Sequence, residues 1–132
     1  MRIMFRLKSI AVMSLFIWIA AIFREYCLIL WEMLLNITGG FVQTDITMDS
    51  TSLSIRVEDS GIGIAKEDQK RIFERFYRVD KGRSKRVAGT GLGLSIVKHV
   101  TEFYGGCVSV ESQSGVGSTF LVQLPAASLV QK

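Results

Sequence analysis

Cysteine is scarce in this chain and forms no recognisable pattern. The 132 residues include only two cysteines, Cys27 and Cys107, which lie far apart in regions of different composition. This spacing indicates neither a disulfide framework nor a zinc site. A chain of this length can bury a core without such cross-links, so we expect one small domain plus an appendage.

Signals of nucleic-acid binding are also lacking, although the net charge is +4. Much of the charge is local, because residues 78–86 hold five basic side chains against one acid. No zinc finger, recognition helix or interleaving of aromatic and basic side chains accompanies them. We therefore expect no nucleic-acid partner, and a polyphosphate is as natural a partner for this basic stretch.

The N-terminal segment, residues 1–36, is far more apolar than the rest. Residues 9–23 contain no charged side chain, and a second apolar stretch covers residues 26–31. The first run is 15 residues long, short of the roughly 20 that cross a bilayer, although flanking Lys and Arg reduce that requirement. Three interpretations stay open: a membrane anchor formed by residues 9–31, an uncleaved signal-like segment, and a scar of truncation or misassembly. For an anchor, Arg2, Arg6 and Lys8 predict that the N-terminus stays inside.

From Gly39 onward the sequence is typical of a globular domain, which we assign to residues 39–127. Apolar side chains alternate with polar ones over 53–58, which is the period of a half-buried strand. The expected elements are strands at 41–47, 53–58, 108–110 and 120–124, turns at 49–50 and 114–117, and helices at 66–76 and 94–104. They predict an α+β two-layer sandwich with helices on one face of a mostly antiparallel mixed sheet, preceded by an apolar N-terminal helical segment.

Four features that could carry chemistry follow one another along this domain. The first is Asp59-Ser60-Gly61-Ile62-Gly63-Ile64, placed directly after a strand. A carboxylate at a strand end can accept a hydrogen bond from an exocyclic amino group, and the two glycines let backbone and ligand approach closely. Taken alone, such a sequence is more often an ordinary turn than a binding site.

The second feature is an aromatic-rich helix end, residues 71–78, and the third is the basic stretch of residues 80–89. Core packing by Phe73 and Phe76 would explain the former, and a solvated loop the latter. The fourth is Gly89-Thr90-Gly91-Leu92-Gly93-Leu94-Ser95, which runs into a helix and exposes backbone N–H groups where phosphate is favoured. It is neither a Walker P-loop nor the dinucleotide fingerprint.

Residues 59–64, 72–77 and 89–95 resemble the G1, F and G2 boxes of histidine kinase ATP-binding domains, both in their order along the chain and in their amino-acid sequences. The resemblance covers residues 53–125, and its closing part is similar to the family's final hairpin. It implies the Bergerat-type fold, which gyrase-type topoisomerases and mismatch-repair ATPases share. The residues that it assigns to the nucleotide are Asp59, Gly61, Gly63, Ile64, Phe76, Tyr77, Arg78, Lys81, Arg83, Gly89, Thr90, Gly91, Leu92, Gly93 and Leu94.

Each part of this assignment has an implied role. Asp59 would accept from the adenine amino group, and Gly61 and Gly63 would shape the base pocket. Basic side chains of residues 78–86 would meet the triphosphate as part of a lid, and the glycines of residues 89–93 would supply backbone donors. The γ-phosphoryl group would pass to a histidine on a dimerisation domain that is not recognisable in this sequence.

The family's N box, a helix whose Glu and Asn serve Mg²⁺, is not recognisable upstream of Asp59. Residues 32–36 are a faint echo in which Asn36 is either a remnant metal ligand or an ordinary helix-end asparagine. The only histidine, His99, lies within the second expected helix, so we interpret it as a surface residue rather than a phosphoacceptor. No catalytic residue can therefore be named.

These observations lead to a functional hypothesis with alternatives. The resemblance implies the ATP-binding catalytic part of a two-component sensor histidine kinase, with ATP and Mg²⁺ as cofactors and a dimerisation domain and a response regulator as partners. It implies a location at the cell membrane with the ATP-binding part in the cytoplasm, or in the cytoplasm alone. The missing N box keeps open a catalytically inactive binding module and a non-functional kinase fragment.

Overall fold

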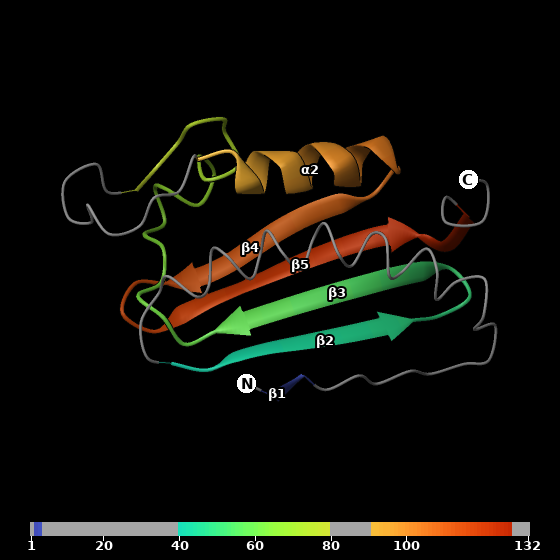
Figure 1. The fold of residues 1–132 in the computed structure, drawn as a ribbon, viewed down its shortest axis with the longest axis horizontal. Helices are drawn as coiled ribbons and strands as arrows, with labels where there is room; N and C mark the ends of the chain where they lie inside the picture. The colour runs from blue at the N-terminus through green and yellow to red at the C-terminus, as the bar shows by residue number, and fades with distance from the viewer. Residues whose placement is uncertain (1, 4–39, 80–90, 128–132) are drawn as a thin grey trace.

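The computed structural model describes residues 2–3, 40–79 and 91–127, and the features of this chain are given for that part (Figure 1). The apolar stretch at 9–31, and with it the predicted helical segment and anchor, lies outside the described residues. Among the described residues, no helix is long and apolar enough to cross a membrane. The elements are β1 (Arg2–Ile3), β2 (Val42–Met48), β3 (Ser52–Asp59), α2 (Gly93–Phe103), β4 (Cys107–Gln113) and β5 (Gly117–Pro125).

The strands form one sheet in the order β1-β2-β3-β5-β4. Neighbours are antiparallel except β1, which runs parallel to β2. Ile46 pairs with Ile55, Ile55 with Val122 and Val122 with Val108, so one row of side chains crosses four strands on the same face. The mostly antiparallel mixed sheet predicted from the alternation is therefore confirmed.

The core lies on the face of the sheet that carries α2. Leu53, Ile55 and Val122 are at most 2% exposed, because alternate residues of a strand point to the same side. α2 packs against β4 and β5 and buries Leu94 and Val97 between itself and the sheet (Figure 1). Helix and sheet thus make the predicted two layers within the described residues.

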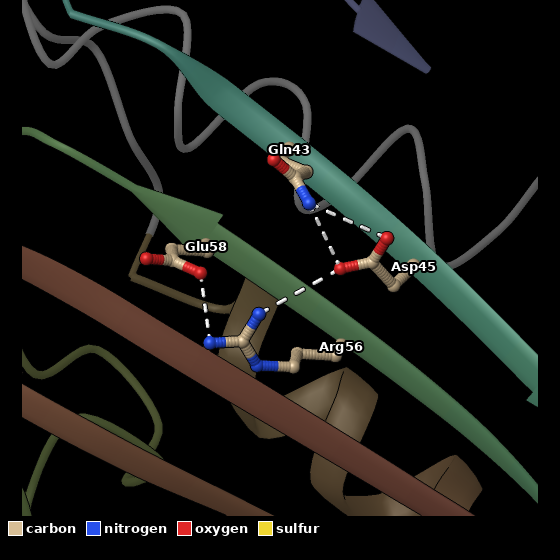
Figure 2. A network of polar contacts seen from close by, with 4 residues as sticks. All are labelled: Gln43, Asp45, Arg56 and Glu58. Carbon is tan, nitrogen blue, oxygen red and sulfur yellow. Dashed lines mark hydrogen bonds and ion pairs between the residues drawn. The ribbon is translucent and has the colours of Figure 1, made fainter. Parts of the chain in front are cut away.

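The opposite face of the sheet is polar where β2 and β3 meet. Arg56 lies between two carboxylates, with Nη2 2.7 Å from Oε2 of Glu58 and Nη1 3.6 Å from Oδ2 of Asp45 (Figure 2). Gln43 donates from Nε2 to Asp45 over 3.1 Å. Ion pairs this exposed contribute roughly 0–1 kcal/mol, so the network keeps this face solvated more than it holds the sheet together.

The β2–β3 hairpin turns at Asp49, as the sequence predicted. Oδ1 of Asp49 accepts hydrogen bonds from the backbone N–H groups of Thr51 and Ser52 at 2.7 and 2.8 Å. The Thr51 hydroxyl also donates to this oxygen, and together with the backbone bonds it lowers the pKa of Asp49. A carboxylate that satisfies the turn's N–H groups fixes the register of the two strands.

The two helix predictions had different outcomes. α2 spans Gly93–Phe103, one residue from the predicted 94–104, and Gly105 follows it with a φ of 75°. His99 lies exposed on this helix, as expected. The helix predicted over 66–76 is wrong, because that segment consists of successive turns.

Hydrogen bonding explains why residues 66–76 do not form a continuous helix. Arg71 N–H bonds to the carbonyl three residues back and Ile72 N–H to the carbonyl four residues back, both at Asp68, so the ladder is mixed. At the end of the segment Phe76 N–H donates to the Gly91 carbonyl oxygen over 2.9 Å instead of to its own turn. Phe76 also has a φ of 63°, which ends any right-handed helix.

Candidate nucleotide-binding site

Asp59 ends β3 on the face that carries α2. Its side chain shares that face with Val57 and is only 7% exposed. Oδ1 accepts a hydrogen bond from Gly61 N–H over 2.8 Å. The hydrogen bond to Asp59 within the described residues goes to Oδ1, and no buried side-chain oxygen there is without a partner, so Oδ2 reaches solvent and can accept from a ligand.

A polar row crosses the sheet beside Asp59. Asp59 pairs with Ser118 of β5, and Ser118 pairs with Ser112 of β4. The two serine hydroxyls lie 2.8 Å apart. Our sequence prediction did not include these serines. Ser112 follows Val110, and Ser118 precedes Phe120, by two residues on the same face of the strand, so each serine places a polar side chain where the alternation would place an apolar one. That interruption of the alternation was the available signal.

The loop after Asp59 is held against the β4–β5 hairpin. Gly115 N–H donates to the Ile62 carbonyl oxygen over 2.7 Å. Gly63 has a φ of 69°, and a Cβ atom built on it would lie 2.0 Å from the Gln113 carbonyl oxygen. Glycine is thus required at residue 63 by both its backbone conformation and the approach of the hairpin.

The aromatic motif divides between core and surface. Ile72 is buried and Phe73 packs partly buried against the core, whereas Phe76 is 69% exposed. Core packing therefore accounts for Phe73 and not for Phe76. Phe76 lies directly against Gly91 of the glycine-rich motif: its N–H donates to the Gly91 carbonyl oxygen over 2.9 Å, and a Cβ built on Gly91 would lie 2.8 Å from the Phe76 Cα.

Tyr77 is fixed by two charged neighbours. Its hydroxyl donates to Oδ1 of Asp68, and the guanidinium of Arg71 lies 4.3 Å from the centre of its ring. The hydrogen bond to Asp68 is the main reason that the pKa of Tyr77 is raised. Tyr77 therefore remains a neutral hydroxyl at physiological pH and carries no charge to a ligand.

The glycine-rich motif leads into α2 without a side-chain cap. Leu92 is the N-cap residue and makes no side-chain capping bond, and no acidic residue lies in the first turn. The Ser95 hydroxyl donates to the Leu92 carbonyl and so leaves the N–H groups of this turn uncapped. Such N–H groups at the positive end of a helix suit a phosphate. Leu94, also predicted to bind the cofactor, is 5% exposed and packs in the core.

Several predicted site residues cannot be placed in this arrangement. Arg78 is exposed and takes part in an interaction. Lys81, Arg83, Gly89 and Thr90 of the basic stretch lie outside the described residues, as does the predicted metal ligand Asn36. Within residues 40–79 and 91–127 no group of three or more His, Cys, Asp or Glu side chains gathers in a way that would hold a metal ion.

A hollow of about 450 Å³ opens at the same end of the sheet. Its lining includes the row Asp59, Ser118 and Ser112 and also the neighbouring row Glu58, Thr119 and Glu111, whose side chains point to the opposite face. Phe41 also lines it and is 56% exposed. Residues whose side chains point to both faces of the sheet therefore line the hollow, and Asp59 is one of them.

Comparison with known proteins identifies the family. The model of the histidine kinase-, DNA gyrase B- and HSP90-like ATPases matches residues 25–128, well over half of the chain. The chain belongs to this ATPase family. The sensor-like histidine kinase SenX3 of Mycolicibacterium smegmatis is 57% identical over 74 residues, which cover 56% of this chain and 19% of that protein.

Solved structures of histidine kinases share the family's fold. Full-length ShkA in complex with AMPPNP superposes with a TM-score of 0.67 at 30% identity, covering 78% of this chain and 21% of ShkA. The mycobacterial sensor histidine kinase MprB gives 0.68 at 25% identity, covering 93% and 83%. The resemblance drawn from the ordered motifs is thus confirmed at the level of this ATPase family, and the similar proteins named here are histidine kinases. The chain spans about a fifth of SenX3.

Proposed function

We propose that this chain binds ATP with its base against Asp59 and its phosphates at the N-terminus of α2. The Asp59 carboxylate carries the proposal: the residue is only 7% exposed, Gly61 N–H holds its Oδ1, and its Oδ2 reaches solvent without a hydrogen-bond partner within the described residues. An adenine amino group supplies the donor that this oxygen lacks. A guanine base presents a carbonyl oxygen at the corresponding position and is disfavoured there.

We further propose that the bound ATP serves phosphotransfer to a histidine of a dimerisation domain. The bond between the γ-phosphorus and the bridging oxygen breaks, a bond from phosphorus to an imidazole nitrogen forms, and ADP leaves. This chain's residues position the nucleotide and neutralise its charge, which is the main contribution of proteins to this chemistry. A response regulator would then receive the phosphoryl group.

Mg²⁺ is proposed to enter with the nucleotide. This ion is commonly held by substrate phosphates with one or two protein ligands, so a site need not contain a dense acidic cluster. Asn36 remains the predicted ligand from the protein. Attachment to the membrane through residues 9–31, with the ATP-binding part in the cytoplasm, likewise remains a proposal, and a cytoplasmic location is its alternative.

Nucleotide binding is tested by titrating the full chain with a fluorescent ATP analogue, with and without Mg²⁺, for the unaltered protein and for Asp59→Asn. The matched control is Asp45→Asn, which alters a carboxylate on the opposite face of the sheet (Figure 2). We expect Asp59→Asn to weaken binding roughly tenfold or more, because a hydrogen bond to a charged group is lost, and Asp45→Asn to leave it unchanged. Folded protein that binds no ATP would refute the proposal.

A second assay separates the kinase from an inactive binding module. A dimerisation domain from a related histidine kinase is supplied with ATP labelled on its γ-phosphate. Transfer of the label to the histidine supports the catalytic function. Binding of ATP without transfer favours a module that kept its nucleotide pocket and lost its chemistry.

A further inference from the structure

Two polar side chains outside the three motifs hold the loop that follows Asp59. Ser112 lies on β4, and its hydroxyl accepts a hydrogen bond from Ile64 N–H over 2.7 Å. Gln69 lies in the turns that follow the loop and donates from Nε2 to the Ile64 carbonyl at 3.0 Å and to the Ser112 carbonyl at 2.8 Å. Both backbone groups of Ile64 are therefore bound by this pair.

The Ser112 hydroxyl and the two N–H donors of the Gln69 side chain are fully used inside the protein. The Ser112 hydroxyl accepts from Ile64 N–H, donates to the Gly117 carbonyl over 2.8 Å, and lies 2.8 Å from the Ser118 hydroxyl. A hydroxyl offers one donor and two acceptor positions, so these three contacts occupy it. The two N–H bonds of the Gln69 amide group are likewise both engaged. The Ser112 hydroxyl and the Gln69 NH₂ group are thus committed to the loop and the hairpin, so their effect is on the loop.

The loop fastened in this way is the one that orients Asp59. Gly61 N–H, three residues before Ile64, is the group that holds Oδ1 of Asp59. The remaining tie between this loop and the hairpin is the bond from Gly115 N–H to the Ile62 carbonyl. Without Ser112 and Gln69, this backbone bond and the two hydrogen bonds between Ser60 and Phe41 would have to keep the loop and its Gly61 N–H group in position.

We propose that Ser112 and Gln69 are positioning residues for base recognition, which they govern by fastening Ile64 to the β4–β5 hairpin. The inference rests on the proposed ATP site and extends it to residues that never touch the nucleotide. A displaced loop lets the Asp59 carboxylate rotate, so the adenine amino group loses its acceptor while the phosphates keep the N–H donors at the start of α2. The consequence is a loss of discrimination between bases rather than a uniform loss of affinity.

The test measures the affinities of fluorescent ATP and GTP analogues for the full chain and its variants. Ser112→Ala removes the hydroxyl, Ser112→Thr restores it, and Gln69→Leu removes both amide bonds. Ser109→Ala is the matched control, because Ser109 lies on the same strand with its side chain exposed on the opposite face. Unfolding curves for every variant show whether the fold survives.

We expect Ser112→Ala and Gln69→Leu to weaken ATP binding about three- to tenfold, as the loss of one or two hydrogen bonds predicts, with little change for GTP. Ser112→Thr should recover the preference, and Ser109→Ala should keep it. An ATP-to-GTP ratio that stays at the unaltered value in both variants overturns the inference. If Ser112→Ala does not fold, Gln69→Leu decides, and loss of folding in both overturns the inference by showing a purely structural role.

The outcome also distinguishes this inference from the proposed function. If the unaltered chain binds ATP and Asp59→Asn weakens it, the nucleotide site stands whatever Ser112 and Gln69 do. If the unaltered, folded chain binds no nucleotide, the proposed function itself fails.

Discussion

Replacing Gly63 by alanine tests how closely the loop after Asp59 approaches the hairpin. A Cβ atom at this position would lie 2.0 Å from the Gln113 carbonyl oxygen, and φ is 69°. The left-handed backbone alone costs an alanine roughly 1–2 kcal/mol. Real Cβ atoms essentially never come within 3.0 Å of such an atom, so the loop must also move. Its movement breaks the bond between Gly115 N–H and the Ile62 carbonyl oxygen, a loss of about 1 kcal/mol.

Gly115 offers a control within the same structure. Its φ is 80°, and a Cβ built on it meets nothing within 4 Å. Gly115→Ala therefore carries the backbone cost of roughly 1–2 kcal/mol and no steric overlap. We expect Gly63→Ala to lower the free energy of unfolding by about 3 kcal/mol or more, since overlap and a broken hydrogen bond are added.

Denaturant unfolding of the two variants, measured side by side, provides the comparison. In a domain of this size each 1 kcal/mol corresponds to roughly 4–8 °C in Tm, so the difference between the variants is also visible by thermal unfolding. Equal destabilisation by the two alanines would refute the reasoning, because it would show that the Gly63 Cβ encounters no obstacle beyond its backbone conformation.

Two further predictions concern the sheet. Leu53→Ala, at a residue 1% exposed, should lower the free energy of unfolding by roughly 2–5 kcal/mol. Ile62→Ala, at a residue 64% exposed, should change it by at most about 0.5 kcal/mol, and similar thermal shifts for both would contradict the core described above. The pKa of Asp49 is lowered in the folded state by the Thr51 hydrogen bonds, so its contribution is present above the unfolded pKa and is lost as pH falls through the folded pKa. The difference in stability between the unaltered chain and Asp49→Ala should therefore shrink in acid, and a constant difference from about pH 7 to about pH 2 would argue against the turn's role.

Much of the fold could be predicted from the sequence because its signals are local. The alternation over 53–58, the acid-led turn at Asp49 and the apolar spacing of 94–104 each depend on a few neighbouring residues, and each is confirmed in the structure. The same holds for the ordered motifs, because each of them, such as 59–64 or 91–95, is a run of consecutive residues. The roles of the individual site residues stay predictions.

The segment at 66–76 shows where local reasoning failed. Its apolar spacing and acidic start are those of a helix. Its backbone hydrogen bonds, however, span three residues in some places and four in others, and the N–H group of Phe76 donates to the Gly91 carbonyl oxygen. The competing bond of the Phe76 N–H group goes to a residue distant in sequence, as does the bond from the Gln69 side chain to the Ser112 carbonyl oxygen. Local periodicity cannot report such bonds, because it contains no information about which strand or loop lies alongside.

The sequence by itself therefore determined the strands, their turns, the helix after the glycine motif, and the family to which the ordered motifs point. Only the tertiary structure decided what holds the site in place. Ile64 meets Ser112 across 48 residues of chain, and Gln69 meets Ser112 across 43. These contacts exist because β3, β5 and β4 pair side by side, and the pairing of strands is a property of the whole sheet rather than of any one segment.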